Sequence, residues 1–390
     1  MMGSMTPEEI LTRCVSEVID KNSLEKKLNS GKKLVVKLGI DPTSPDLHLG
    51  HSVVLRKLSA FQQLGHHVVL VIGDFTALVG DPSGRNTQRP PLTEAEIEKN
   101  LADFKAQAGK ILDLNKLTIR KNSEWLKDLG LTGLFKLASS ATVNQLLERK
   151  DFQDRLKENN SLTVLEILYP LLQAYDSVAL KADIELGGTD QKFNLLMGRQ
   201  IQKRYGQSEQ DILTTPLLVG LDGKDKMSKS LGNYIGLTED APSMFGKVMS
   251  LPDFLLESYF DLTTNVSSSD ANQILEVGPY EAKKRLASEI VTLYHDSEEA
   301  KQARGEFDRV FSSKENPSNI VEIKVDSQPQ SYVSLTSIAF NISRSEAKRL
   351  IEQKALEIDG VTILDPEEEV TPKNDQVLKL GKHRFVRIAI

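Results

Sequence analysis

The sequence predicts an α/β fold with three parts: a domain built on a parallel β-sheet, a helical domain, and a small C-terminal α+β domain. An apolar segment at 32–40, a helical pattern at 49–65 and a second apolar segment at 66–75 follow one another as strand, helix and strand. This order is the βαβ unit of a parallel sheet. Residues 239–312 have a mostly helical pattern, and 332–390 combine two short helical patterns with two strand-like segments. A chain of 390 residues is too long for one ordinary core, so several domains are expected.

The first domain is expected to span residues 1–235 and to begin with a helix at 6–28. The strand at 32–40 ends at Gly39 and Asp41-Pro42, because glycine and proline interrupt regular structure. The later elements follow in this order: a helix at 93–112, a strand at 117–126, helices across 132–178, a strand, glycine turn and helix across 182–206, and a strand with a lysine-rich loop across 211–230.

Composition changes mark the remaining boundaries. We expect a helical domain at 236–315 and the C-terminal domain at 332–390. The segment between them, 316–331, is polar and contains proline, which is typical of a linker.

Composition also limits the class of protein. Hydrophobic residues make up 39% and charged residues 27%, as in soluble globular proteins, and the net charge of −6 means that any nucleic-acid contact needs a local basic surface. Cys14 is the one cysteine, so no internal disulfide or cysteine-rich zinc site can form. The sequence shows no apolar segment of transmembrane length and no signal-peptide pattern, so we expect a cytoplasmic protein without membrane contact.

The segment "PDLHLGH" places His48, Gly50 and His51 at the start of a predicted helix. Four roles are open: a metal site, a helix cap, a catalytic base, or a nucleotide-binding site. A metal site would need a third ligand, and neither an HExxH pattern nor a cysteine cluster is nearby, so we expect no metal. A helix N-terminus attracts phosphate oxygens, and a glycine there lets a base or ribose approach the backbone.

Two lysines, Lys226 and Lys229, lie in "KMSKS" after a glycine-containing loop. Such a pair suits a polyphosphate whose charge changes during reaction, but it is also common in a solvated loop. Tyr169, Gln173 and Asp176 share one helix face, where they line a polar pocket or form the edge of an amphipathic helix.

Two glycine-rich turns complete the candidate site. Gly187 and Gly188 in "GGTDQ" allow close backbone approach, and Asp190 could accept from ribose hydroxyls. In "GDPSGRNTQR", an acid within a glycine turn could hold an ammonium group, and two arginines could reach phosphates, although exposed arginines in a turn are equally ordinary. The sequence contains no P-loop, no dinucleotide-binding glycine motif and no nucleophile elbow.

Together and in this order, "HLGH" and "KMSKS" resemble the paired signatures of class I aminoacyl-tRNA synthetases. "KLGIDPTSPDLHLGH", "LVGDPSGR", "YPLLQAYD" and "GGTDQKFN" resemble bacterial tyrosyl-tRNA synthetases in particular, over about residues 32–235. "SRSEAKRLIEQKALEIDG" resembles the start of an S4-type RNA-binding domain. The resemblance implies a Rossmann-like catalytic domain at 1–235, a helical anticodon-side domain at 236–315 and an S4-like domain at 332–390.

The resemblance also implies residue roles. The catalytic residues would be His48, His51, Lys226, Lys229 and Thr43. ATP would be bound by Gly39, Asp41, Gly50, Gly188, Asp190, Met227, Ser228, Arg85 and Arg89. Tyrosine would be bound by Lys37, Asp81, Tyr169, Gln173, Asp176 and Gln191. The tRNA would be bound by Arg344, Lys348, Arg349, Lys382 and Arg384.

The implied activity has two steps. Tyrosine reacts with ATP, bound as its Mg²⁺ complex, to give tyrosyl-adenylate, and the tyrosyl group then passes to tRNA(Tyr). The resemblance further implies a homodimer. One position departs from the best-known branch of the family, which has a tyrosine where this chain has Lys37, and this resembles a second bacterial subgroup. Lys37 would pair with Asp176 or point elsewhere.

Three other functions compete. A tryptophanyl-tRNA synthetase shares the architecture, but Asp176 and the S4-like segment argue against it. A non-catalytic RNA-binding protein would not need intact "HLGH" and "KMSKS" motifs. A nucleotidyltransferase for another small molecule would not need the tyrosine-pocket motifs or the RNA-binding segment.

Overall fold

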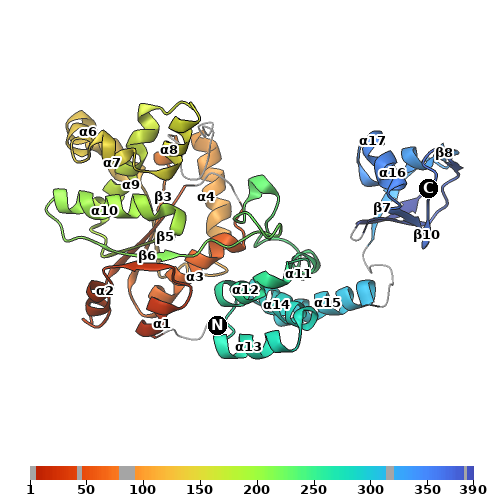
Figure 1. Ribbon diagram of the computed structural model, residues 1–390, viewed down its shortest axis with the longest axis horizontal. Helices are drawn as coiled ribbons and strands as arrows, with labels where there is room; N and C mark the ends of the chain where they lie inside the picture. Colours follow the sequence, from red (N-terminus) through yellow and green to blue (C-terminus); the bar gives the residue numbers. More distant parts are fainter. Residues whose placement is uncertain (1–5, 42–45, 79–92, 313–319, 382–383) are drawn as a thin grey trace. The chain divides into compact units, whose positions relative to one another are not determined.

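The structure, a computed structural model, describes residues 6–41, 46–78, 93–312, 320–381 and 384–390. The chain divides into two compact units, Met1–Lys301 and Gln302–Ile390 (Figure 1). The first unit contains the predicted parallel sheet and most of the helical segment. The second contains the small C-terminal sheet.

A six-stranded sheet with the order β1-β6-β5-β2-β3-β4 forms the centre of the first unit. The strands are β1 (Glu17–Ile19), β2 (Val35–Ile40), β3 (His67–Ile72), β4 (Leu117–Lys121), β5 (Ile184–Gly188) and β6 (Asp211–Thr215). All neighbouring strands are parallel except β1, which pairs antiparallel with β6. Their near-continuous apolar sequences fit a sheet that is covered on both faces.

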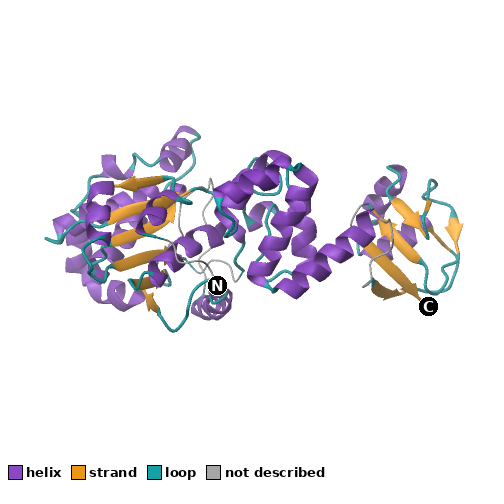
Figure 2. Cartoon of the chain, turned by 90° about the horizontal axis from the view of Figure 1, so that it is seen from below, coloured by secondary structure: helices purple, strands orange, loops and turns teal. Residues whose placement is uncertain are grey.

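Helices lie on both faces of this sheet (Figures 1 and 2). Helix α3 (Leu49–Gln63) contacts β2, β3 and β5, and helix α9 (Val164–Leu180) packs on α10 (Lys192–Arg204) and contacts β2. The remaining helices of this region are α1 (Pro7–Thr12), α2 (Lys21–Leu28), α4 (Glu94–Ala108), α5 (Ser123–Leu126), α6 (Gly130–Ala138), α7 (Val143–Leu146) and α8 (Lys150–Lys157).

A helical region follows, in which α11 packs on α14 and α12 packs on α3, α13 and α14. Its helices are α11 (Ala241–Met249), α12 (Leu256–Thr263), α13 (Ser268–Glu276), α14 (Pro279–Tyr294) and α15 (Ser297–Phe307). Across the described ranges, no helix combines the length and the apolar character needed to cross a bilayer.

The second unit has a five-stranded sheet with the order β10-β9-β12-β13-β7 and a two-stranded sheet of β11 and β8. Its elements are β7 (Val321–Lys324), β8 (Gln330–Ser331), α16 (Tyr332–Phe340), α17 (Arg344–Glu352), β9 (Leu356–Ile358), β10 (Val361–Thr362), β11 (Glu369–Val370), β12 (Val377–Leu380) and β13 (Arg384–Ala389). A separate hydrophobic core, which includes Leu335, Ile351 and Leu378, lies between helices and sheet.

Three segments differ from the sequence prediction. The predicted strand at 117–126 is β4 followed by helix α5, because its pairing with β3 ends at Lys121. The predicted helix at 6–28 is two helices separated by β1, because Glu17–Ile19 pair with β6 at the edge of the sheet. Within the predicted linker at 316–331, Val321–Lys324 form β7, which pairs in parallel with β13. The physical reason is that this polar segment carries alternating apolar side chains and supplies an edge strand.

A buried lysine on α3 secures the N-terminal helix. Lys57 Nζ donates to Ile10 O at 2.9 Å and to Arg13 O at 2.5 Å, at the C-terminal end of α1. Burial lowers the pKa of Lys57 to about 8. The lysine thus satisfies carbonyl groups that a helix end leaves without an intrahelical partner.

We expect Lys57→Met to lower the free energy of unfolding of the first unit by about 1–3 kcal/mol, because the carbonyls lose their donor inside the protein. The measurement is urea unfolding followed by the fluorescence of Trp125, the single tryptophan. Lys21→Met is the control, since Lys21 is exposed and its pair with Glu25 spans 3.8 Å; a change within about 0.5 kcal/mol is expected there. Equal effects of the two substitutions would contradict this role.

Candidate active site

The sheet places the predicted site residues at the carboxyl ends of β2 and β5. These two strands are neighbours. From β2 the chain continues to β3, which lies on the side of β2 away from β5, so the strand order reverses between β2 and β5. Ligands of open parallel sheets bind at such a reversal. Gly39 leaves open space here, since a Cβ added to it would have no atom within 4 Å.

The histidine pair is held by contacts at the start of α3. His48 lies just before the helix in extended backbone, and its backbone N–H donates to His51 Nδ1 at 3.3 Å. The two ring centroids are 3.9 Å apart. His48 Nδ1 is buried and has no hydrogen-bond partner within the described residues. This nitrogen is enclosed by the protein beside Gly50.

Both imidazoles are neutral at pH 7. Burial, with a smaller contribution from His51 and the two motif lysines, lowers the pKa of His48 to about 2. Burial lowers the pKa of His51 to about 4, although Asp190 acts in the opposite direction. The pair can therefore donate or accept hydrogen bonds without carrying charge in the free protein.

Gly50 lies in close contact with the His48 ring. A Cβ added at Gly50 would lie 3.0 Å from His48 Cε1 and Nδ1, and 3.6 Å from Met227 Cβ. Any larger residue would therefore press on the imidazole. Glycine at this position therefore lets the imidazole and the Met227 side chain pack against the start of α3.

The KMSKS loop is anchored by Asn233. Asn233 Oδ1 accepts from Ser228 N at 2.8 Å, and its Nδ2 donates to Lys226 O at 3.2 Å. Met227 N donates to Leu218 O at 2.8 Å, and Met227 is buried. The loop therefore has a defined backbone, while its lysine side chains remain partly exposed.

Each motif lysine is paired with an acid of the site. Lys226 Nζ lies 2.8 Å from Asp190 Oδ2, and Lys229 pairs with Asp46 of the "PDLHLGH" segment. The Asp190 side chain can lie beside Lys226 because Gly188 has no side chain. A Cβ added at Gly188 would lie 2.7 Å from Asp190 Oδ1. Ion pairs this exposed contribute little to stability, so the lysines can exchange partners readily.

Backbone pairing joins the two motifs directly. Leu49 N donates to Ile235 O at 3.0 Å, and Leu237 N donates to Leu47 O at 2.9 Å. His48 and Gly236 form the bridge between these bonds. The segment that follows KMSKS is therefore fixed to the start of α3, and the two signatures face one site.

A second group of predicted residues lines the region beside β2. Tyr169 OH donates to Asp41 Oδ2 at 2.8 Å, and Thr76 Oγ1 donates to Asp41 Oδ1 at 3.0 Å. The side-chain oxygens of Gln173 and Gln191 both accept from Asn194 Nδ2, at 2.9 and 3.0 Å. The structure thus brings the polar residues of α9 and of the "GGTDQ" turn together.

Asp176 is a buried carboxylate in this region. Its Oδ1 accepts from Trp125 Nε1 at 2.8 Å. Burial raises the pKa of Asp176 to about 7, and the Lys37 charge and the Trp125 hydrogen bond limit the rise. The carboxylate therefore changes its charge near neutral pH.

Lys37 is engaged with an acid other than Asp176. Its Nζ donates to Glu185 Oε1 at 2.8 Å and to Ser177 Oγ at 2.9 Å, and all three side chains are buried. Lys37 and Glu185 are register partners on β2 and β5, so they point to the same face of the sheet. Of the two alternatives left by the sequence, the structure favours a lysine that is bonded to residues other than Asp176.

Five predicted residues lie outside the described residues: Thr43, Asp81, Arg85, Arg89 and Lys382. In the second unit, Arg344, Lys348 and Arg349 are exposed on α17, where Lys348 pairs with Glu367 at 3.0 Å. Arg384 is exposed and stacks over Phe340, with 5.9 Å from its guanidinium carbon to the ring centroid.

Sequence analysis missed several residues that support the site, among them Asp46, Asn194 and Asn233. Asp46 and Asn194 both lie inside quoted motifs, "PDLHLGH" and "GGTDQKFN", so both could have been found as polar residues next to motif positions. Asn233 gave no local signal, because its role depends on how the loop folds back.

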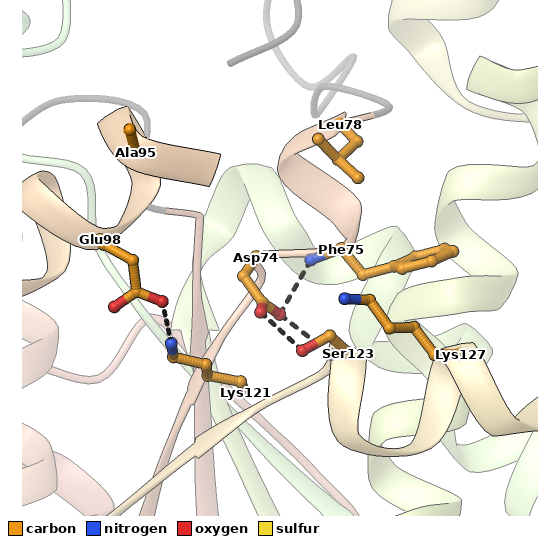
Figure 3. A pocket seen from close by; sticks show the side chains of 8 residues that line it. All are labelled: Asp74, Phe75, Leu78, Ala95, Glu98, Lys121, Ser123 and Lys127. Atoms are coloured by element: carbon orange, nitrogen blue, oxygen red, sulfur yellow. Dashed lines mark hydrogen bonds and ion pairs between the residues drawn. The ribbon is translucent and has the colours of Figure 1, made fainter. Parts of the chain in front are cut away.

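A separate hollow lies at the carboxyl ends of β3 and β4 (Figure 3). Asp74 occupies its centre and accepts from Phe75 N and Ser123 N at 2.9 Å each, and from Ser123 Oγ at 2.6 Å. Lys121 pairs with Glu98 at its side. Neither signature motif lines this hollow, and its acid is satisfied by the protein itself.

Comparison with known proteins agrees with this geometry. The family model for tRNA synthetases class I (W and Y) matches residues 29–312, and the S4 domain model matches 335–377. The tyrosine–tRNA ligase of Aquifex aeolicus is 46% identical over 389 residues, which cover 98% of this chain and 99% of the relative. That of Carboxydothermus hydrogenoformans is 48% identical over 397 residues and 97% of each chain.

Solved structures show the same fold. The tyrosyl-tRNA synthetase of Archaeoglobus fulgidus, solved with L-tyrosine, has a TM-score of 0.61 at 25% identity, over 77% of this chain and 99% of that one. The C-terminally truncated mitochondrial enzyme of Aspergillus nidulans has a TM-score of 0.65 at 22% identity, over 78% and 97%. The match of sequence, domains and fold over nearly the whole length shows that the chain belongs to the tyrosine–tRNA ligase family of class I aminoacyl-tRNA synthetases.

Proposed function

We propose that the site described above activates tyrosine with MgATP and transfers the tyrosyl group to the 3′ end of tRNA(Tyr) in the cytoplasm. The observation that carries this proposal is the backbone pairing of residues 235–237 with 47–49, which sets the lysines of KMSKS opposite the histidines of HLGH. A site of this kind offers donors and cations for a triphosphate but no nucleophile.

In the first step, a carboxylate oxygen of tyrosine forms a bond to the α-phosphorus of ATP while the bond to pyrophosphate breaks. The substrate supplies its own nucleophile, so catalysis rests on positioning and on donors matched to the transition state. His48 and His51 donate to the phosphates, Gly50 lies under the adenosine, and Thr43 contacts the phosphates beside His48. Mg²⁺ enters as part of the ATP substrate and neutralises phosphate charge.

The lysines act by changing partners. In the free protein Lys226 and Lys229 are paired with Asp190 and Asp46. When ATP binds, the lysines move to the departing pyrophosphate and Asp190 accepts from the ribose hydroxyls. In the second step, a hydroxyl of the terminal tRNA ribose attacks the adenylate carbonyl and AMP leaves.

Tyrosine recognition divides between the two ends of the amino acid. Tyr169, Gln173 and Asp81 hold the ammonium group, Gln191 lies near the carboxylate, and Asp176 accepts from the phenol hydroxyl. A site built to hydrogen-bond a hydroxyl rejects the analogue that lacks it, and tyrosyl enzymes are the standard example. Lys37 acts on this pocket through its charge, because its ammonium group is bonded to Glu185 and Ser177.

We propose a homodimer, with an interface formed by α6, α7 and the start of α9. Helices α6 and α7 both contact α9. Four large apolar side chains on these elements are exposed in the single chain: Leu131 (72%), Phe135 (68%), Val143 (61%) and Val164 (74%). An exposed apolar surface of this kind is typical of a protein–protein interface.

The first test is amino-acid-dependent ATP–pyrophosphate exchange with tyrosine, phenylalanine and tryptophan side by side. Exchange with tyrosine alone is expected, and exchange with tryptophan would assign the chain to the sister enzyme. Absence of exchange with all three would contradict the proposal and favour a non-catalytic RNA-binding protein.

His48→Ala is expected to lower the exchange rate about 10²- to 10³-fold. Tyrosine binding should stay within about twofold, because this contact strengthens as charge develops; equal losses would refute the role of His48.

The affinity for tyrosine in the absence of ATP should depend on pH through Asp176, whose pKa is about 7. The ionised carboxylate is the better acceptor for the phenol, so affinity should fall about tenfold from pH 8 to pH 6. Equilibrium dialysis at several pH values measures this. Asp176→Asn is the control, with weak binding that is constant over this range; tighter binding at low pH would contradict the assignment.

Arg349→Glu in the second unit should lower kcat/KM for tRNA about tenfold or more, because a phosphate contact becomes repulsive. Pyrophosphate exchange should not change. Lys373→Glu is the matched control, since Lys373 is also exposed in this unit and the charge change is equal. The salt slope of tRNA binding should fall by roughly one for Arg349→Glu but not for Lys373→Glu. Equal behaviour of the two variants would exclude α17 from the RNA-binding surface.

A further inference from the structure

Two glutamines of the tyrosine pocket share one partner. Asn194 Nδ2 donates to Gln173 Oε1 at 2.9 Å and to Gln191 Oε1 at 3.0 Å. Asn194 is buried, with 2% of its surface exposed. One amide group from the first turn of α10 therefore connects a residue of α9 with a residue of the "GGTDQ" turn.

The orientation of the Asn194 amide is set by Arg149. Arg149 Nη1 donates to Asn194 Oδ1 at 3.2 Å. A guanidinium group can only donate, so the oxygen of the amide must face it and the NH₂ group must face the glutamines. An amide that otherwise could be placed either way round has one orientation here.

That orientation passes on to the glutamines. Because Asn194 presents donors to both, Gln173 and Gln191 must present their oxygens to it. Their Nε2 donor groups then face away from Asn194. The arginine therefore determines which end of each glutamine amide is directed to the pocket.

Arg149 is itself held in place. It precedes the first residue of α8, and its Nε and Nη2 donate to Asp151 Oδ1 and Oδ2 at 3.0 and 2.7 Å. Its guanidinium carbon lies 4.5 Å from the centroid of the Phe152 ring, which is fully buried. Arg149 is 4% exposed, so the guanidinium has no space to turn.

We propose that Arg149 is a positioning residue that sets the donor and acceptor pattern of the amino-acid pocket through Asn194. The inference rests on the proposed function, since it assumes that Gln173 and Gln191 bind tyrosine. With the amides set this way, Gln191 directs a donor to the substrate carboxylate. With the amide reversed, an oxygen would face that carboxylate and repel it.

The test compares Arg149→Met and Asn194→Asp in the full chain by pyrophosphate exchange. Arg149→Met removes the donor but keeps the stacking bulk on Phe152. Asn194→Asp keeps an acceptor for Arg149 and removes the donors to both glutamines. We expect each to raise KM for tyrosine about tenfold or more. KM for ATP should stay within about twofold, and Arg149→Lys should recover part of the loss.

Arg155→Met is the matched control, because Arg155 is a buried arginine of the same helix that pairs with Glu166 at 2.6 Å. It should lower the unfolding midpoint without changing KM for tyrosine. If Arg149→Met behaves like Arg155→Met, or if Asn194→Asp leaves KM unchanged, the positioning role is refuted. Absence of exchange in the unmodified protein would instead refute the proposed function.

Discussion

The site depends on a short backbone pairing between segments that are far apart in the chain. Leu49 N to Ile235 O and Leu237 N to Leu47 O hold the strand-like residues after KMSKS against the start of α3. These bonds involve no side chain of either motif, so the motif residues can change partners while the frame stays fixed. The sheet supplies the second half of the frame, because β2 and β5 end side by side where the strand order reverses. The residues proposed to bind phosphate groups and the amino acid are thereby brought to one edge.

The same edge contains charges that a sheet interior normally excludes. Lys37 and Glu185 are both buried, and removing two charges from water costs several kcal/mol that the pair recovers only with good geometry and further hydrogen bonds. Ser177 and Gln210 supply those bonds to Glu185. Two packed apolar side chains would stabilise the fold as well as this ion pair does. We therefore infer that the Lys37–Glu185 pair has a role other than stability. Its lysine charge opposes the effect of burial on the pKa of Asp176, and it thereby favours the ionised carboxylate that the proposed contact with the phenol requires.

The sequence predicted the succession of strands and helices along the chain and the motifs at the carboxyl edge of the sheet, because apolar runs and glycine turns are local signals. It could not predict β1 or β7, since both are edge strands whose identity depends on a partner distant in the sequence. The pairing of Lys37 with Glu185 was not predicted either, because it depends on the strand register that sets the two residues side by side. The ion pair of Lys229 with Asp46 and the hydrogen bonds of Asn194 to two glutamines likewise depend on the tertiary structure.

In the free protein the positive charge of the site is largely neutralised, and this affects how the site can lower the activation barrier. The imidazoles are neutral because burial disfavours their charged forms, and each motif lysine is paired with an acid. A site with four exposed positive groups would bind any polyphosphate strongly, and binding that is equal in ground and transition states does not accelerate the reaction. In the proposed mechanism the lysines leave exposed ion pairs of low stability, and the histidine contacts would strengthen as charge develops on the phosphate. The attraction therefore grows along the reaction, which is the condition for a site without a nucleophile to raise the rate.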